Sequence, residues 1–129
     1  MQERLLLQIC VATGGLIPVV AGSAGILLGP NFVNAIVGLA ADSHFRYLSG
    51  LLLGLGIAFW STIPRIEENG ARFRLLTFVV FAGGVGRLYS LAAIGIPPVG
   101  MVGALVMELA VTPLLCFWQW RVSRRLWRP

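Results

Sequence analysis

The sequence is poor in charged residues, and it contains no lysine at all. Only 12% of its 129 residues are charged, whereas an ordinary soluble domain has about a quarter. It has a single histidine and two cysteines, Cys10 and Cys116, which do not form a CxxC motif. A chain of this composition has too few polar side chains to cover a water-exposed surface. The composition therefore argues against a soluble enzyme, a disordered chain and a disulfide-rich secreted domain.

What the sequence has in abundance is apolar residues. They make up 57% of the chain, and the mean hydropathy is +0.86, which together predict an integral membrane protein. All ten basic residues are arginine, and the formal net charge is +5. In a soluble protein this excess would suggest a nucleic-acid partner. Here most arginines lie between apolar stretches, so we expect the partner to be the lipid bilayer and not a nucleic acid.

Four stretches of the chain are long and apolar enough to cross a membrane, which requires about 20 residues. They cover residues 5–28, 43–63, 75–94 and 99–120. The sequence therefore predicts an all-α fold, a transmembrane bundle of four helices that forms one domain over residues 1–129.

The arginines outside these spans predict the orientation of the chain. They lie before the first span, between the second and third, and after the fourth. The connections 29–42 and 95–98 contain no basic residue. The positive-inside rule then places both termini in the cytoplasm. Trp60, Trp118, Trp120 and Trp127 suit an aromatic belt at the inner interface. The eight arginines are Arg4, Arg65, Arg72, Arg74, Arg121, Arg124, Arg125 and Arg128.

The first outer connection leaves two alternatives open. Pro30 suggests a helix start, and Phe32, Ile36 and Leu39 follow at near-helical spacing, which favours a short helix on the outer membrane surface. The other alternative is an ordered apolar loop.

Two opposite charges fall inside the third and fourth spans. Arg87 lies eight residues before Gly95, where the third span ends, and Glu108 lies nine residues after Val99, where the fourth begins. A rise of 1.5 Å per residue puts them about 12 and 13 Å below the outer surface. The short connection makes the two spans antiparallel neighbours. We therefore predict an Arg87–Glu108 ion pair in the outer half of the bilayer.

The start of the second span carries three more polar residues, Asp42, His44 and Arg46. Asp42 and Arg46 are four residues apart and can pair on one helical face. With Arg87 and Glu108, these residues form a predicted polar cluster that opens outwards and is the candidate ligand site. The sequence indicates no catalytic nucleophile, and one histidine with two carboxylates is not a convincing metal site.

A structural interpretation of the same five residues stays open beside the functional one. A buried Arg–Glu pair often only fixes helix register. Asp42 at the start of a helix is typical of an N-cap. His44 is more typical of a hydrogen-bonded surface residue than of a ligand or a base.

Three blocks of sequence resemble a known family. Residues 42–50 read DSHFRYLSG, and Gly83, Gly84, Arg87 and Ser90 match a Gly-Gly-x-x-Arg-x-x-Ser element. A glutamate in the last span, Glu108, is followed by Pro113. This pattern resembles the bacterial family of domain of unknown function 4345, which contains small four-span proteins of the inner membrane. The resemblance covers nearly the whole chain. It implies a bacterial cytoplasmic membrane and no established activity, since function does not follow from fold.

Three functions are compatible with these features. The sequence favours a non-catalytic accessory or structural subunit that packs laterally against other membrane proteins or against itself. The alternative is a binding or transporter-like protein that holds a small anionic or lipid-like ligand in the outer cluster. The third function is an enzyme on a lipid or quinone-like substrate, with His44 or Glu108 as acid or base. No cofactor is indicated.

Overall fold

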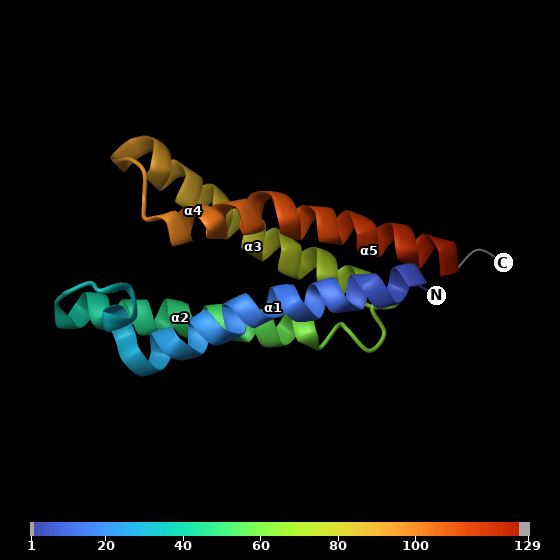
Figure 1. Ribbon diagram of the computed structural model, residues 1–129, viewed down its shortest axis with the longest axis horizontal. Helices are drawn as coiled ribbons and strands as arrows, with labels where there is room; N and C mark the ends of the chain where they lie inside the picture. Colours follow the sequence, from blue (N-terminus) through green and yellow to red (C-terminus); the bar gives the residue numbers. More distant parts are fainter. Residues whose placement is uncertain (1, 127–129) are drawn as a thin grey trace. The chain divides into compact units, whose positions relative to one another are not determined.

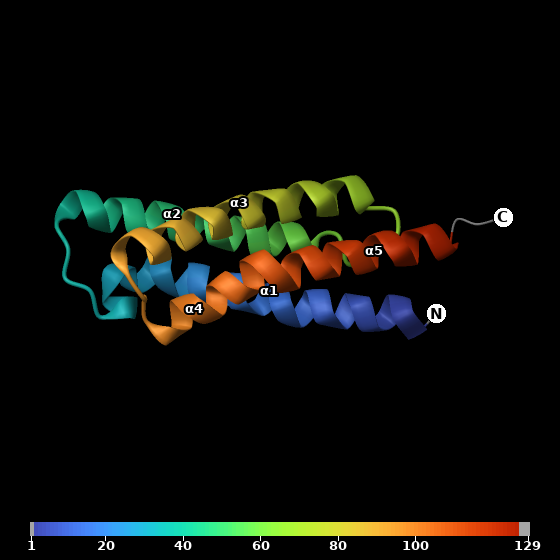
Figure 2. The ribbon, with the colours of Figure 1, turned by 90° about the horizontal axis from the view of Figure 1, so that it is seen from above.

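The computed structural model describes residues 2–126, and most of them are helical (Figure 1). No β-strand occurs between residues 2 and 126, which confirms the predicted all-α class. The elements are α1 (Gln2–Leu28), the 3-10 helix η1 (Gly29–Val33), α2 (Leu39–Trp60), α3 (Gly70–Ile94), α4 (Val99–Val106), the π-helix η2 (Met107–Val111) and α5 (Thr112–Leu126). α4, η2 and α5 follow one another without interruption and form one helical arm (Figure 2).

Three helical segments are long and apolar enough to cross a membrane. They are Gln2–Val33, Gly70–Ile94 and Val99–Arg125. α2 has 22 residues, but the polar side chains near its start lower its hydropathy. The apolar helices indicate a membrane protein. α1, α3 and α5 also continue beyond the predicted spans, because helical hydrogen bonding extends into the charged segments that flank each apolar stretch.

The chain divides into two compact units, which are described separately. The first, called the α1–α2 unit, comprises Ile9–Ile63. The second, called the α3–α5 unit, comprises Met1–Gln8 and Pro64–Pro129. The first turns of α1 therefore group with the second half of the chain.

The first connection contains less helix than the pattern of apolar residues suggested. Gly29 ends α1 in the left-handed region with φ +60°, and the five-residue η1 ends at Asn34, which also has a positive φ of 57°. Residues 35–38 are irregular. Phe32, Ile36 and Leu39 thus lie in three different elements and not on one surface helix, because two left-handed residues interrupt the chain.

α2 begins earlier than the predicted second span. Its N-cap is Gly38, so Asp42 lies in the first turn and is not the N-cap. The helix ends at Trp60, three residues before the predicted boundary at 63. The hydroxyl of Ser61 donates to the carbonyl of Ala58 at 2.6 Å, one of the side-chain bonds that accompany the end of the helix.

The buried core of the α3–α5 unit lies where four segments meet. Leu7, Ile66 and Phe73 are completely buried, and Val122 is 3% exposed. They come from the first turns of α1, the loop before α3, the start of α3 and the end of α5. Gln119, also fully buried, donates from Nε2 to the carbonyl of Ile66 at 2.8 Å. The loop before α3 is therefore a packed part of the unit.

Ion pairs surround this core, in a region that we call the arginine-rich end (residues 2–8, 64–74 and 119–126). Arg4 pairs with Glu67 at 3.0 Å and Arg125 pairs with Glu3 at 2.7 Å. These contacts tie segments more than 60 residues apart in sequence, and sequence reasoning did not predict them. Trp127 of the predicted aromatic belt and Arg128 lie outside the described residues.

Close contact between α1 and α2 depends on glycine. A Cβ added to Gly22 would lie 2.6 Å from the backbone nitrogen of Leu53 and 2.7 Å from the carbonyl oxygen of Ser49. No atom lies within 4 Å of the corresponding position at Gly14. Nearby, the indole Nε1 of Trp60 donates to the carbonyl of Ala12 at 3.0 Å. The two helices therefore approach backbone to backbone at Gly22, as small residues permit in membrane helices.

This difference between two glycines of α1 gives a test of the packing. Gly22→Ala should lower the free energy of unfolding by about 1–3 kcal/mol, because the methyl group meets backbone that cannot move aside. Gly14→Ala is the control and should be neutral or stabilising by up to about 1 kcal/mol, through helix propensity alone. Unfolding in mixed micelles, followed by circular dichroism, measures both. Equal effects of the two variants would show that the close approach at Gly22 is absent.

Candidate functional site

Arg87 and Glu108 form the predicted ion pair within the α3–α5 unit. Nε of Arg87 lies 3.0 Å from Oε2 of Glu108, and Nη2 lies 3.1 Å from Oε1. The two parallel hydrogen bonds make the pair bidentate, which is the strongest geometry open to these side chains. The Arg87 side chain is 34% exposed and that of Glu108 is 18% exposed. The pair links α3 to η2.

Gly84, one turn before Arg87, brings the two helices close enough for this pair. A Cβ at Gly84 would lie 2.9 Å from Cβ of Glu108 and 2.7 Å from Cδ2 of Leu109. A larger residue at this position would push η2 away from α3. Gly84 thus allows α3 and η2 to approach closely, and this approach brings Arg87, three residues later, within reach of Glu108.

Glu108 lies in the π-helical turn that precedes Pro113. The backbone N–H of Thr112 donates to the carbonyl of Met107, five residues earlier, and the Thr112 hydroxyl donates to the same carbonyl at 2.8 Å. Pro113 has no N–H to donate, and its ring would crowd the carbonyl of Leu109 in a regular α-helix. A wider turn relieves this crowding. π-turns of this kind are frequent at functional sites.

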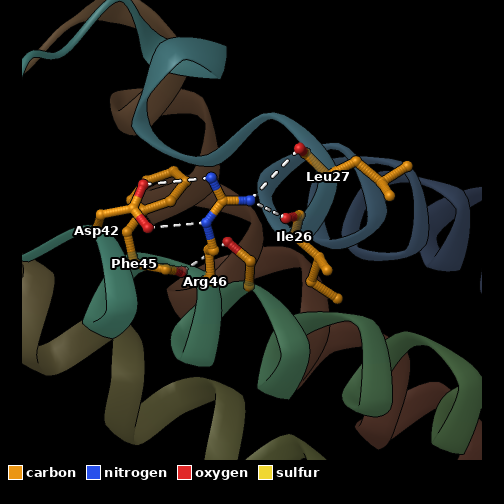
Figure 3. A network of polar contacts seen from close by, with 6 residues as sticks. Ile26, Leu27, Asp42, Phe45 and Arg46 are labelled. Carbon is orange, nitrogen blue, oxygen red and sulfur yellow. Dashed lines mark hydrogen bonds and ion pairs between the residues drawn. The ribbon is translucent and has the colours of Figure 1, made fainter. Parts of the chain in front are cut away.

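Asp42 and Arg46 form the second pair, within the α1–α2 unit (Figure 3). Nε of Arg46 lies 2.8 Å from Oδ2 of Asp42, and Nη2 lies 3.3 Å from Oδ1. Nη1 of Arg46 donates to the carbonyl of Ile26 and, at 3.4 Å, to that of Leu27. Figure 3 shows the guanidinium between the carboxylate on α2 and these two carbonyls at the end of α1. Arg46 therefore caps the end of α1 while it forms an ion pair with Asp42 on its own helix, α2.

Every nitrogen of the Arg46 guanidinium is thus engaged inside the protein. Gly29 keeps this contact possible, because a Cβ there would lie 2.5 Å from Nη2 of Arg46. Arg87 differs, since its Nη1 makes no hydrogen bond to any residue from 2 to 126. Of the two arginines in the predicted ligand cluster, only Arg87 has a guanidinium nitrogen without a hydrogen bond to residues 2–126.

His44 is exposed and belongs to neither ion pair. Its ring lies 6.3 Å from that of Tyr47, centroid to centroid, at an interplanar angle of 32°. The imidazole therefore faces the next turn of α2 and not the Asp42–Arg46 pair.

The five predicted site residues are found as two pairs and one separate side chain. Arg87 pairs with Glu108 and Asp42 pairs with Arg46, each within its own unit. The prediction that all five form one cluster stays a prediction. Sequence reasoning missed Gln119, although an amide in the apolar and aromatic run around residue 119 is a usable signal of a specific buried hydrogen bond.

Comparison with known proteins identifies the family. The sequence model of the family described as Domain of unknown function (DUF4345) matches residues 6–119. The chain belongs to this family. The matched region of this DUF4345 protein includes both ion pairs, Gly84 and η2. Its family description assigns no activity, so the geometry of these residues carries the functional argument. No curated protein and no solved structure shows significant similarity to it.

A double-mutant cycle tests the coupling of Arg87 with Glu108. Arg87→Ala and Glu108→Ala should each lower the free energy of unfolding by about 3–5 kcal/mol, because each leaves a half-buried charge without its partner. The double variant should cost at least about 1 kcal/mol less than the sum of the two. Arg74 is exposed and lies on the same helix as Arg87. Arg74→Ala should change the free energy of unfolding by less than about 0.5 kcal/mol. A double variant that costs the full sum would show that the two charges do not interact.

Proposed function

We propose that this DUF4345 protein is a non-catalytic accessory or structural subunit of a larger membrane assembly, located in a bacterial cytoplasmic membrane. The observation that carries the proposal is the state of the two arginines within the apolar helices. Both form bidentate pairs with carboxylates of the same chain, and Arg46 also caps α1. Charges satisfied in this way hold helices in register and leave little capacity for chemistry.

The distribution of residues between helices and connections supports the same function. Irregular chain is confined to short connections in residues 2–126, such as 34–38, 61–69 and 95–98, so almost no water-soluble part is available for a separate activity. Many large apolar side chains are exposed on the helices, for example Leu75 at 63%, Phe78 at 68% and Tyr89 at 76%. These faces suit lateral contact with lipid or with other membrane helices.

Extraction of the native membrane with a polymer that retains lipid tests this function. We expect the 13.9 kDa chain to remain in a complex of larger mass with a second protein, or with further copies, at fixed stoichiometry. The complex should persist in the Arg46→Lys variant, because Arg46 is engaged by Asp42 and by the carbonyls at the end of α1 within its own chain. Recovery of a monomer that carries one bound small molecule would contradict the accessory role.

That outcome would favour the second candidate, a binding protein for a small anionic or lipid-like ligand. The open Nη1 of Arg87, beside the π-turn of Glu108, is the feature that supports this candidate. A ligand held there should be lost from Arg87→Lys, because lysine replaces the planar group with a single ammonium. It should be retained by Arg46→Lys, because Arg46 is occupied by Asp42 and the carbonyls of α1.

We also propose that α2 crosses the membrane as a fourth span, with both termini in the cytoplasm. Three spans would put the termini on opposite sides of the membrane, whereas four put them on the same side. Arginine is concentrated next to both termini and in the 64–74 segment, which supports a cytoplasmic location for all three.

Green fluorescent protein fused to either terminus should fluoresce, and alkaline phosphatase at the same positions should be inactive. Phosphatase activity at one terminus only would indicate three spans.

A further inference from the structure

The arginine-rich end of the α3–α5 unit carries an uncompensated positive charge. Within the described residues it contains seven arginines and only three glutamates. Each glutamate is already paired: Glu3 with Arg125 and, at 3.9 Å, with Arg121, Glu67 with Arg4, and Glu68 with Arg65 at 3.6 Å. Seven arginines against three glutamates leave this end with a formal charge of +4 within residues 2–126. The seven are Arg4, Arg65, Arg72, Arg74, Arg121, Arg124 and Arg125.

Arg124 is the arginine whose geometry is most specific. Its guanidinium carbon lies 4.5 Å from the ring centroid of Trp120, and no carboxylate of residues 2–126 pairs with it. A guanidinium held against an indole face keeps its N–H edges free, and it is more weakly hydrated than an ammonium group. Arg124 is thus held in place by an aromatic ring, while its N–H groups make no hydrogen bond to any side chain or carbonyl of residues 2–126.

Two aromatic rings continue this arrangement along α5. Trp120 is 39% exposed and Phe117 is 60% exposed, and their ring centroids lie 5.6 Å apart. Phe117, Trp120 and Arg124 are spaced by three and four residues, so they lie on one face of α5. We call them the aromatic–arginine stripe. It changes from apolar to charged over about two turns.

The stripe lies at the end of a segment that can span a membrane. Val99–Arg125 is long and apolar enough to cross, so its last turns fall where acyl chains give way to headgroups. Tryptophan is enriched at this depth because its ring is apolar and its N–H is polar. Basic residues on the cytoplasmic side of a membrane attract anionic lipids. The order of the stripe matches the order of groups along a phospholipid.

We propose that the aromatic–arginine stripe binds an anionic phospholipid. Arg124 would donate to the phosphate, and Trp120 and Phe117 would contact the glycerol region and the upper acyl chains. The chemistry recognised is a phosphate group attached to an apolar chain. This binding does not depend on the accessory function, since it concerns a lipid and not a protein partner.

Native mass spectrometry of the full chain in detergent tests the proposal. The probes are phosphatidylglycerol, which is anionic, and phosphatidylcholine with the same acyl chains, which is zwitterionic. The unmodified chain should bind phosphatidylglycerol more tightly than phosphatidylcholine. Arg124→Gln should weaken this binding about fivefold, the equivalent of about 1 kcal/mol for one arginine near a lipid surface. Phosphatidylcholine binding should not change.

Arg65→Gln is the matched control. It removes one charge from the same end of the unit, but Arg65 is paired with Glu68 and its side chain is 75% exposed. It should change phosphatidylglycerol binding less than about twofold. Equal losses in Arg124→Gln and Arg65→Gln would overturn the proposal, because net charge alone would then explain the binding.

Two further measurements keep the proposal falsifiable if Arg124→Gln loses helix content. Trp120→Leu retains the charge of Arg124 and should still weaken phosphatidylglycerol binding severalfold; unchanged binding would remove the ring from the site. Excess inorganic phosphate should not displace the lipid from the unmodified chain. Displacement would show that the stripe binds a free anion and not a phospholipid.

Discussion

A charge placed within the membrane-spanning part of a helix needs a partner within the protein, because the hydrocarbon interior of the bilayer offers none. The two units of this chain meet that requirement in different ways. Arg46 finds its carboxylate four residues away on the same helix, so the pair forms as α2 forms. Arg87 finds Glu108 only when α3 packs against η2, so that pair depends on tertiary structure. The first stabilises a helix end, and the second fixes the register between two helices.

Glycine is what makes both arrangements possible. Gly29 leaves room for the Arg46 guanidinium at the end of α1, and Gly84 allows the backbone of α3 to approach Glu108. Burial of apolar side chains contributes less to specificity here, because lipid tails are as apolar as the side chains that contact them. Of the five largest fully buried side chains among the described residues, four lie at the arginine-rich end: Leu7, Ile66, Phe73 and Gln119. Polar contacts and close backbone approach therefore define the structure more than apolar burial does.

Hydropathy and spacing predicted much of this structure. Long apolar stretches mark the helices, and matching depths along antiparallel neighbours predicted the Arg87–Glu108 pair. The spacing of four residues predicted Asp42 with Arg46. The carbonyls of Ile26 and Leu27 could not be predicted as partners, because they become available only where α1 ends beside α2. Gln119 has the same character, since its acceptor is the backbone of a loop far away in the sequence.

The π-turn at Met107–Val111 has a consequence for the whole α4–α5 arm. A regular α-helix advances by about 100° per residue, whereas a π-turn accommodates about one residue more per turn. The faces of α4 and α5 are therefore offset in phase relative to an uninterrupted helix. Removal of one residue from this turn would restore the regular phase and rotate every side chain of α5 relative to Glu108. The turn thus sets which residues of α5 share a face with the ion pair and which face the membrane.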